Sequence, residues 1–182
     1  MKQLTNTTNF SKKQILSFFK KFYNAEPEIV PTDMTLPSSS RICLGKSAIL
    51  KCLPELEFNP FCDRLLYIFS YNKITNPGTL NFYNYIDLLH FLSTRTATSL
   101  KLFHSFSIFD TDNDGEISGP DLFECVERLC NYMMTQQESM KIVEYVCQEA
   151  DRDNEGTISF LEYESILTTC SDFVQSFSIR FA

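Results

Sequence analysis

Two twelve-residue segments in the second half of the chain share one spacing of oxygen-bearing side chains. Residues 110–121 read DTDNDGEISGPD, and residues 151–162, which begin 41 positions later, read DRDNEGTISFLE. In both segments such side chains occupy positions 1, 3, 5, 9 and 12, glycine stands at position 6 and isoleucine at position 8. Because chance would have to produce this pattern twice, the repeat constrains the fold more than any other feature.

This spacing is that of a calcium-binding loop. Short carboxylates at positions 1, 3 and 5 converge on one ion, the glycine permits a sharp turn, and position 12 closes the coordination sphere. Position 7 supplies its backbone carbonyl, and position 9 often acts through a water molecule. The predicted metal ligands are Asp110, Asp112, Asp114, Glu116, Ser118, Asp121, Asp151, Asp153, Glu155, Thr157, Ser159 and Glu162. Ile117 and Ile158, at position 8, are expected to pair the two loops through a short β bridge.

The two loops differ at position 12, the residue whose reach influences whether a loop prefers Ca²⁺ or Mg²⁺. Glu162 is long enough to bind an ion with both oxygens, which suits the six to eight oxygen ligands that Ca²⁺ takes. Asp121 is one methylene shorter and is expected to give one oxygen, which suits the octahedral shell of Mg²⁺. The first loop is therefore expected to hold Mg²⁺ or to bind Ca²⁺ weakly. Glu155 is longer than the usual residue at position 5 and must fold back or bind through water.

The rest of the chain reads as helical. Ser11 with Gln14, and Thr135 with Glu138, have the spacing of capping boxes that open helices. No long stretch alternates as a strand would. The fold class is therefore all-α, built from helix–loop–helix units of the EF-hand kind with short β bridges between paired loops. The expected helices span about 11–24, 45–53, 60–69, 81–93, 99–109, 119–134, 136–150 and 160–170.

The first half is predicted to contain two more copies of the unit that have lost their ligands. Gly78 and Leu80 align with the glycine and isoleucine of the first calcium loop, but Lys73, Thr75 and Pro77 then occupy ligand positions. These side chains cannot bind a divalent cation. A weaker copy is expected around residues 33–45. The chain is thus divided into a metal-free N-terminal lobe (1–95), a metal-binding C-terminal lobe (96–170) and an apolar tail (171–182).

The net charge of −7 supports metal binding and argues against nucleic acid. The chain has 16 basic and 23 acidic side chains, and the two loops together carry −8, so the remainder is nearly neutral. A nucleic-acid partner would require clustered Lys and Arg. No motif for a nucleophile with its base and no phosphate-binding glycine loop is present, so we expect no enzyme.

The sequence also predicts the compartment. The seven cysteines are odd in number and include no Cys-x-x-Cys, which favours free thiols in a reducing compartment. No apolar run approaches the length of a membrane span, and Lys2 stands where N-myristoylation requires glycine. We therefore expect a cytoplasmic protein that reaches a membrane only when a partner recruits it.

Several motifs outside the loops resemble the calcium- and integrin-binding (CIB) protein family. They are LPELEFNPF at 53–61, followed by Arg64 and IFS at 68–70, and the ending SDFVQSFSIRF at 171–181. The metal-free first half and the residues Asp121 and Glu162 also match, whereas Glu155 departs from the family's usual Asp. The similarity runs from about Phe10 to the C-terminus, nearly the whole chain.

The resemblance implies a monomeric adaptor without catalytic activity. Proteins of this family bind amphipathic helices, such as an integrin α cytoplasmic tail or segments of kinases and mechanotransduction channels, in a hydrophobic groove of the C-terminal lobe. The residues expected to line this groove are Leu102, Phe106, Leu122, Val126, Leu129, Val143, Val146, Ile166, Leu167, Phe173 and Phe177. The tail would lie in the groove and move when a target helix enters, unless it is permanent core packing.

Three other interpretations remain open at this point. A cytosolic cation buffer of the parvalbumin kind would need neither groove nor tail. A phosphatase subunit similar to calcineurin B would normally have four intact loops, which the first half argues against. Lys13, Lys20 and Lys21 on one helix face could contact anionic lipid, although a solvated face explains them as well.

Overall fold

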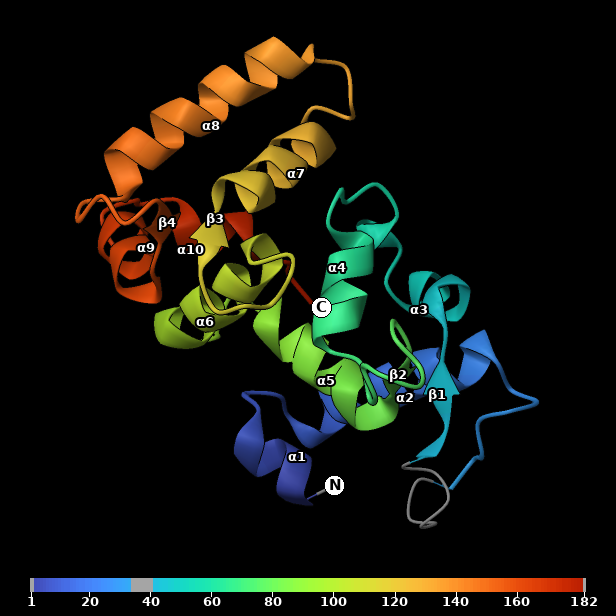
Figure 1. Cartoon of the computed structure of the whole chain (residues 1–182). Helices are drawn as coiled ribbons and strands as arrows, with labels where there is room; N and C mark the ends of the chain where they lie inside the picture. Colours follow the sequence, from blue (N-terminus) through green and yellow to red (C-terminus); the bar gives the residue numbers. More distant parts are fainter. Residues whose placement is uncertain (1, 34–40, 182) are drawn as a thin grey trace. The chain divides into compact units, whose positions relative to one another are not determined.

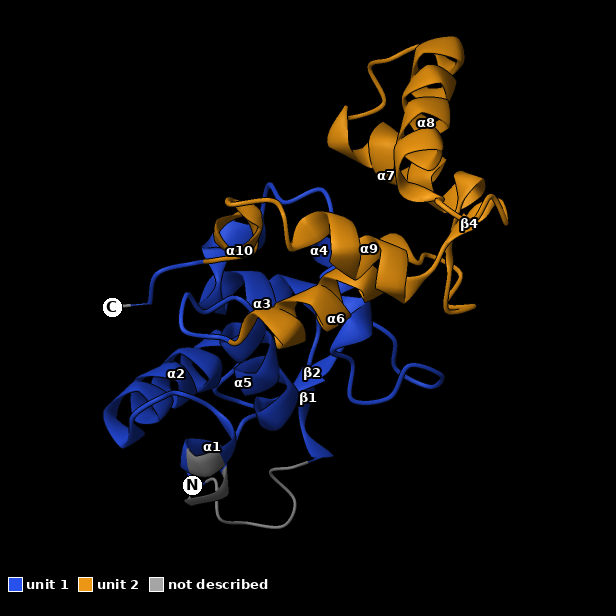
Figure 2. Ribbon diagram, turned by 90° about the vertical axis from the view of Figure 1, so that its left-hand side faces the viewer, with its two compact units in different colours: residues 1–96, 179–182 blue, residues 97–178 orange. Residues whose placement is uncertain are grey.

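The computed structural model describes residues 2–33 and 41–181 and divides the chain into two compact units (Figure 2). Unit 1 comprises Met1–Thr96 and Ile179–Ala182, and unit 2 comprises Ala97–Ser178. The chain is all-α in the described residues apart from two-residue strands, as predicted (Figure 1). The predicted tail segment 171–182 is shared: its first part belongs to unit 2 and its last residues to unit 1.

Unit 1 contains a pair of helix–loop–helix units joined by a short antiparallel ladder. Leu80 pairs with Leu44, so the position-8 residue of the degenerate second copy bridges to the end of the weaker first copy. Residues 34–40 of that first copy lie outside the described part. The elements are α1 (Lys2–Thr7), α2 (Lys12–Ala25), β1 (Cys43–Leu44), α3 (Lys46–Cys52), the 3₁₀ helix η2 (Pro54–Leu56), α4 (Cys62–Ile68), β2 (Leu80–Asn81) and α5 (Phe82–Phe91).

The core of unit 1 forms where one face of α2 meets α5. Ile15, Phe18 and Phe22 lie at helical spacing on α2 and are buried. The Phe22 ring lies 5.5 Å from the rings of both Phe82 and Tyr85 on α5, measured between centroids. Helix α2 begins with the predicted capping box, in which Ser11 and Gln14 satisfy each other's backbone amides.

The end of the chain is part of unit 1. The Ile179 amide donates a hydrogen bond of 2.6 Å to the carbonyl of Leu92, and Ser93 and Ile179 form a parallel β bridge. The Phe181 ring then packs edge-on against the rings of Phe10 and Phe18, at 6.1 and 5.6 Å between centroids. The last residues are therefore fixed between α2 and the end of α5.

Unit 2 contains the two predicted calcium loops, each between two helices. Ile117 pairs with Ile158 in an antiparallel ladder, so the predicted β bridge is confirmed. Helix α8 begins with the predicted Thr135–Glu138 capping box. The elements are α6 (Thr98–Phe109), β3 (Ile117–Ser118), α7 (Gly119–Leu129), α8 (Gln136–Ala150), β4 (Thr157–Ile158), α9 (Phe160–Leu167) and α10 (Phe173–Ser176).

Three predicted helices have different ends. The helix predicted over 119–134 stops at Leu129, because Asn131 and Tyr132 adopt the left-handed conformation with φ of 51° and 56°. Helix α9 ends at Leu167, three residues early, and α4 starts at Cys62 instead of Pro60. The short helices α1, η2 and α10 were not predicted.

Within the described residues, no helix is both long and apolar enough to cross a membrane.

Candidate metal centre

The first three acidic residues of the first loop converge as a cation site requires. Oxygen atoms of Asp110, Asp112 and Asp114 all lie within 4.8 Å of one another. Backbone amides hold the carboxylates in place: Gly115 donates to Asp110 (3.2 Å) and Glu116 donates to Asp114 (2.9 Å). Gly115 has φ of 97°, a conformation that glycine adopts at little cost. Positions 1, 3, 5 and 6 of this loop thus have the arrangement that suits an oxygen-coordinated divalent cation.

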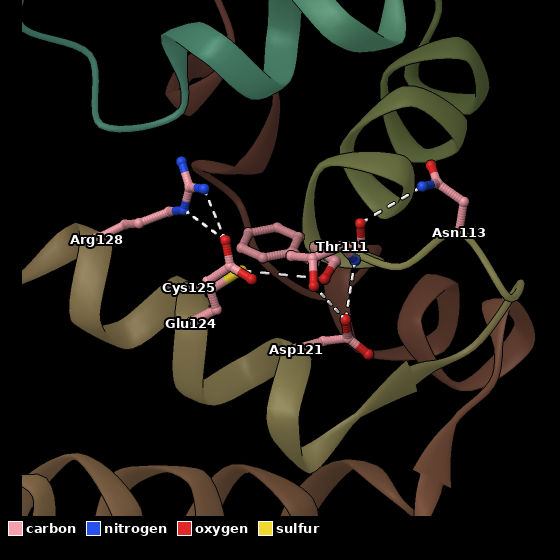
Figure 3. A network of polar contacts seen from close by, with 7 residues as sticks. Thr111, Asn113, Asp121, Glu124, Cys125 and Arg128 are labelled. Atoms are coloured by element: carbon pink, nitrogen blue, oxygen red, sulfur yellow. Dashed lines mark hydrogen bonds and ion pairs between the residues drawn. The ribbon is translucent and has the colours of Figure 1, made fainter. Parts of the chain in front are cut away.

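Asp121, the last residue of the first loop, does not join the group of oxygens formed by Asp110, Asp112 and Asp114. Its Oδ1 atom accepts hydrogen bonds from the amide and hydroxyl of Thr111 (Figure 3). Its Oδ2 atom accepts from the amide and hydroxyl of Ser118. Burial of this carboxyl raises its pKa, but the four hydrogen bonds together hold the pKa below its ordinary value. Asp121 is therefore kept ionised at the loop's closing position, although its oxygens are outside the group formed by positions 1, 3 and 5.

The second loop brings its closing glutamate into the site. Oxygen atoms of Asp151, Asp153 and Glu162 lie within 4.8 Å of one another. The Gly156 amide donates to Asp151 (2.8 Å), and the Arg152 amide donates to Glu162 (2.8 Å). The described geometry thus matches the prediction that a glutamate at position 12 reaches further than an aspartate. Glu155 is exposed and lies outside this group.

The two loops contact each other at position 7 as well as through the strands. The Thr157 hydroxyl donates a hydrogen bond of 2.7 Å to the carboxylate of Glu116. Thr157 is also the partner of Ser118 in the β3–β4 ladder. The backbone carbonyl at position 7 is a ligand in such loops. An ion that fixes position 7 of one loop therefore also affects position 7 of the other loop, because the two residues are hydrogen-bonded.

Repulsion among the carboxylates shows what a cation would relieve. Burial raises the pKa of the Asp110 carboxyl, and the charges of Asp114 and Asp121 raise it further, against amide hydrogen bonds from Gly115 and Asn113. A divalent ion would reverse this penalty because it replaces repulsion between like charges with attraction. The first loop fits Ca²⁺ on this ground, and both loops fit it because oxygen donors supply the whole site.

The remaining predicted ligands serve two purposes. Ser118 and Ser159, at position 9, are the N-cap residues of α7 and α9, and each forms a capping box with the position-12 carboxylate. Both boxes have the signature Ser-x-x-Asp/Glu in the sequence, yet only the metal pattern was recognised there. Loop closure and helix initiation therefore depend on the same pair of side chains in each loop.

We expect Glu162 to make metal-free stability dependent on pH. Hydrogen bonds from the Ser159 hydroxyl and amide and from the Arg152 amide lower its pKa from the ordinary 4.5 to about 2. A pKa lowered by folding means that the charged form stabilises the fold above pH 4.5, and that this contribution is lost as the pH falls through 2. When a chelator keeps both proteins free of metal, the difference in unfolding free energy between the wild type and Glu162→Gln should shrink as the pH falls from 4.5 to about 2. A difference that stays constant from pH 6 to pH 2 would contradict this account.

Most of the predicted groove residues lie together in the core of unit 2. Leu102, Phe106 and Phe173 are buried there. Partly buried residues pack against them, and these include five further groove predictions: Leu122, Val146, Ile166, Leu167 and Phe177. The structure does not place Val126, Leu129 or Val143 in this cluster, and the side chain of Leu129 is 59% exposed. The tail residues Phe173 and Phe177 thus fill the space that a groove would offer.

A buried lysine attaches the tail to α6, and this contact was not predicted. The Lys101 ammonium donates to the carbonyl of Phe177 (2.6 Å) and to the hydroxyl of Ser178 (3.0 Å). Its side chain is fully buried, and this burial lowers its pKa to about 8. In the sequence, Lys101 stands out only as the one Lys, Arg, Asp or Glu residue of helix α6.

Comparison with known proteins agrees with this geometry. A family model described as an EF-hand domain pair matches residues 100–168, which contain both loops and their helices. Calcium and integrin-binding family member 2 of Drosophila melanogaster is 34% identical over 95% of this chain and 89% of its own length. The human members 2 and 3 are 31% and 28% identical over the same shares of the two chains.

The segments 53–61 and 171–181, which carry the resemblance to the family, can be located in the structure. The first contains η2 and the approach to α4, and the second contains α10 and the residues that return to unit 1. Two paired loops with convergent oxygens and similarity along nearly the whole chain lead to one conclusion. The chain belongs to the calcium and integrin-binding protein family and binds Ca²⁺ through its EF-hand pair.

Proposed function

We propose that this chain is a cytoplasmic, monomeric adaptor that binds an amphipathic helix of a partner through unit 2. The binding would be controlled by Ca²⁺ in the second loop and by Mg²⁺ or Ca²⁺ in the first. The partner would be the cytoplasmic segment of a membrane protein, such as an integrin α tail or a mechanotransduction channel, or a kinase. The name of the relatives, which combines calcium with integrin binding, supports this choice. The chain would act by binding and not by catalysis.

One observation carries the proposal: α7 and α8 leave an apolar surface uncovered. A pocket of about 450 Å³ lies between these helices and is lined mainly by Phe123, Met140 and Val143 with the start of α7. Val126 and Leu129 follow Phe123 at intervals of three residues, so they continue the stripe along α7. Leu129 and Met140 are 59% and 51% exposed. An exposed apolar stripe of this kind is typical of a helix-binding surface.

The charge of unit 2 indicates the polar face of the partner helix. Residues 97–178 contain 4 basic and 16 acidic side chains, a net charge of −12, and two divalent ions would leave it at −8. A helix with Lys and Arg beside its apolar stripe would therefore associate faster and more tightly than a neutral one. Met140 in the pocket lining can adjust to side chains of different shape.

The asymmetry of the loops supports different ions for them. Both closing carboxylates accept hydrogen bonds through both oxygens, but only Glu162 also has an oxygen within 4.8 Å of the first acidic ligands of its loop. A loop closed by Asp121 would leave coordination positions to water, as Mg²⁺ prefers. The first loop would then be filled at low Ca²⁺, and the second loop would respond when Ca²⁺ rises.

The surface between α7 and α8 can be tested by substitution. We expect Leu129→Glu combined with Met140→Glu to weaken binding of a basic integrin α-tail peptide about tenfold or more, because charge would replace apolar contact. Calorimetric titration of the Ca²⁺-loaded protein measures this. Ile74→Glu is the control, since Ile74 is an exposed apolar residue in a loop of unit 1 and should leave binding unchanged. Equal affinity for all three proteins would contradict the proposed surface.

A further inference from the structure

Unit 1 contains a polar pocket that metal and helix binding do not use. It has a volume of about 220 Å³ and lies where the start of α2, the segment after α5 and the end of the chain meet. Arg95 and Arg180 line it, together with the polar residues Gln14, Ser93 and Thr94. The rings of Phe10 and Phe181 complete its wall. The described lining therefore offers guanidinium, amide and hydroxyl donors and includes no Asp or Glu.

The backbone holds both arginines at the pocket. Arg180 lies between Ile179, whose amide bonds to Leu92, and Phe181, whose ring packs against Phe10. The carbonyl of Arg95 accepts a hydrogen bond of 2.9 Å from the side-chain amide of Asn9, and its amide donates to the Ser93 hydroxyl. Two arginines from distant parts of the sequence thus have their backbone held beside one cavity, and the side chains of both are exposed.

No Asp or Glu of the described residues, 2–33 and 41–181, forms an ion pair with the arginines of this pocket. Ser93 is only 4% exposed, and its hydroxyl can donate to a group inside the pocket while it accepts from Arg95. Two arginines at one pocket without a carboxylate partner in the described residues, next to hydroxyl and amide donors, favour an anion with several oxygens.

The exposed face of α2 extends the positive charge away from the pocket. At 3.6 residues per turn, Lys21 lies two turns from Gln14 and about 20° from its line, whereas Lys13 and Lys20 lie about 100–120° round the helix from Gln14. All three lysines are exposed. Unit 1 has 12 basic and 7 acidic side chains, a net charge of +5 beside the −12 of unit 2. The positive charge therefore forms a strip wider than one small anion needs.

We propose that this pocket binds a phosphate group of an inositol phospholipid and holds unit 1 against an anionic membrane. A phosphate monoester carries nearly two negative charges and oxygens that match the forked donors of two arginines. The three lysines would lie along the lipid surface and strengthen the attachment. A soluble phosphate or a phosphorylated peptide would use the pocket but would gain little from the strip, which is why we assign the lipid source.

The test is vesicle binding by the full chain. We expect binding to phosphatidylcholine vesicles that contain a phosphatidylinositol bisphosphate, and about tenfold weaker binding to vesicles of equal charge made with phosphatidylserine. Arg95→Gln with Arg180→Gln should remove this preference. Arg41→Gln with Lys73→Gln removes the same charge from unit 1 elsewhere and should keep the preference. Arg95→Lys with Arg180→Lys keeps the charge but loses the forked donors, and should show an intermediate preference.

Four outcomes would overturn the proposal. Equal binding to both kinds of vesicle would mean attraction to charge without a pocket. Loss of the preference in the Arg41/Lys73 variant would mean the same. Tighter binding of soluble inositol trisphosphate, or of a phosphopeptide, than of the inositol-lipid vesicles would assign the pocket to another source. A retained preference in the Arg95/Arg180 variant would show that the arginines do not hold the lipid. An unchanged Ca²⁺ titration and circular dichroism spectrum shows that each arginine variant is folded.

Discussion

Glutamine in place of Glu162 is expected to lower the Ca²⁺ affinity of the second loop by about a hundredfold. Glu162 closes this loop, and one of its oxygens lies within 4.8 Å of oxygens of Asp151 and Asp153. Glutamine is nearly the same size but has no charge and offers one acceptor oxygen, so bidentate coordination is lost. Ca²⁺ titration followed by calorimetry measures the loss, and the first loop should retain its own affinity.

The capping box gives this experiment a matched control. Glutamine can still accept from the Ser159 amide at the start of α9, so the metal-free variant should remain folded. Glu138→Gln makes the same change in the capping box of α8, which lies outside both loops. It should therefore leave Ca²⁺ binding unchanged. Similar losses of Ca²⁺ affinity in the two variants would show that helix capping, and not coordination, explains the effect.

Alanine in place of Phe173 is expected to destabilise unit 2 by about 3 kcal/mol, because a buried aromatic ring would leave a cavity. Phe173 is 6% exposed within the unit 2 core, and its ring lies 5.5 Å from that of Phe177 between centroids. Urea unfolding of the Ca²⁺-loaded protein measures the change. If the partner helix extends from the surface between α7 and α8 into the space that Phe173 fills, the same variant should bind the integrin-tail peptide more tightly, since the tail would occupy that space less firmly.

These two readouts separate a displaceable tail from permanent core packing. If the tail competes with a partner helix, stability falls while helix affinity rises. If the tail is only core, stability falls and helix affinity falls with it or stays the same, which would sink the displacement model. Phe103→Ala is the control within the same unit: its side chain is 59% exposed, so both quantities should change little.

The repeat predicted the C-terminal half well because its signal is chemical as well as periodic. Fixed ligand spacing identified both loops, and the position-8 isoleucines predicted the β3–β4 ladder that the structure contains. The capping boxes at Ser11 and Thr135 located the starts of α2 and α8 to the residue. Such local signals act over a few residues, so they can be read from the sequence without knowledge of the fold.

Features that depend on distant residues were not predictable. The apolar pattern of residues 119–134 continues past Leu129, but Asn131 and Tyr132 turn the chain in left-handed conformations that no glycine marks. The contact between Lys101 and Phe177 joins residues 76 positions apart. The return of Ile179 and Phe181 to unit 1, and with it the pocket between Arg95 and Arg180, likewise depends on tertiary packing.

The structure also changes the view of the predicted groove. Eleven apolar residues were predicted to line one helix-binding groove, whereas eight of them form the core of unit 2 or pack against it. Leu129 remains largely exposed, and Val143 lines the pocket between α7 and α8. Helical periodicity identifies an apolar face but does not show which part of that face another segment of the chain covers.

The central claim is that cation binding and helix binding are coupled in unit 2. The most direct test is a calorimetric Ca²⁺ titration of the full chain in a Mg²⁺ buffer, with and without a saturating basic integrin α-tail peptide. The account predicts that the peptide raises Ca²⁺ affinity about tenfold, and that Ca²⁺ raises peptide affinity by the same factor, as linkage requires. An identical Ca²⁺ titration with and without the peptide would contradict the account and would leave a simple cation buffer.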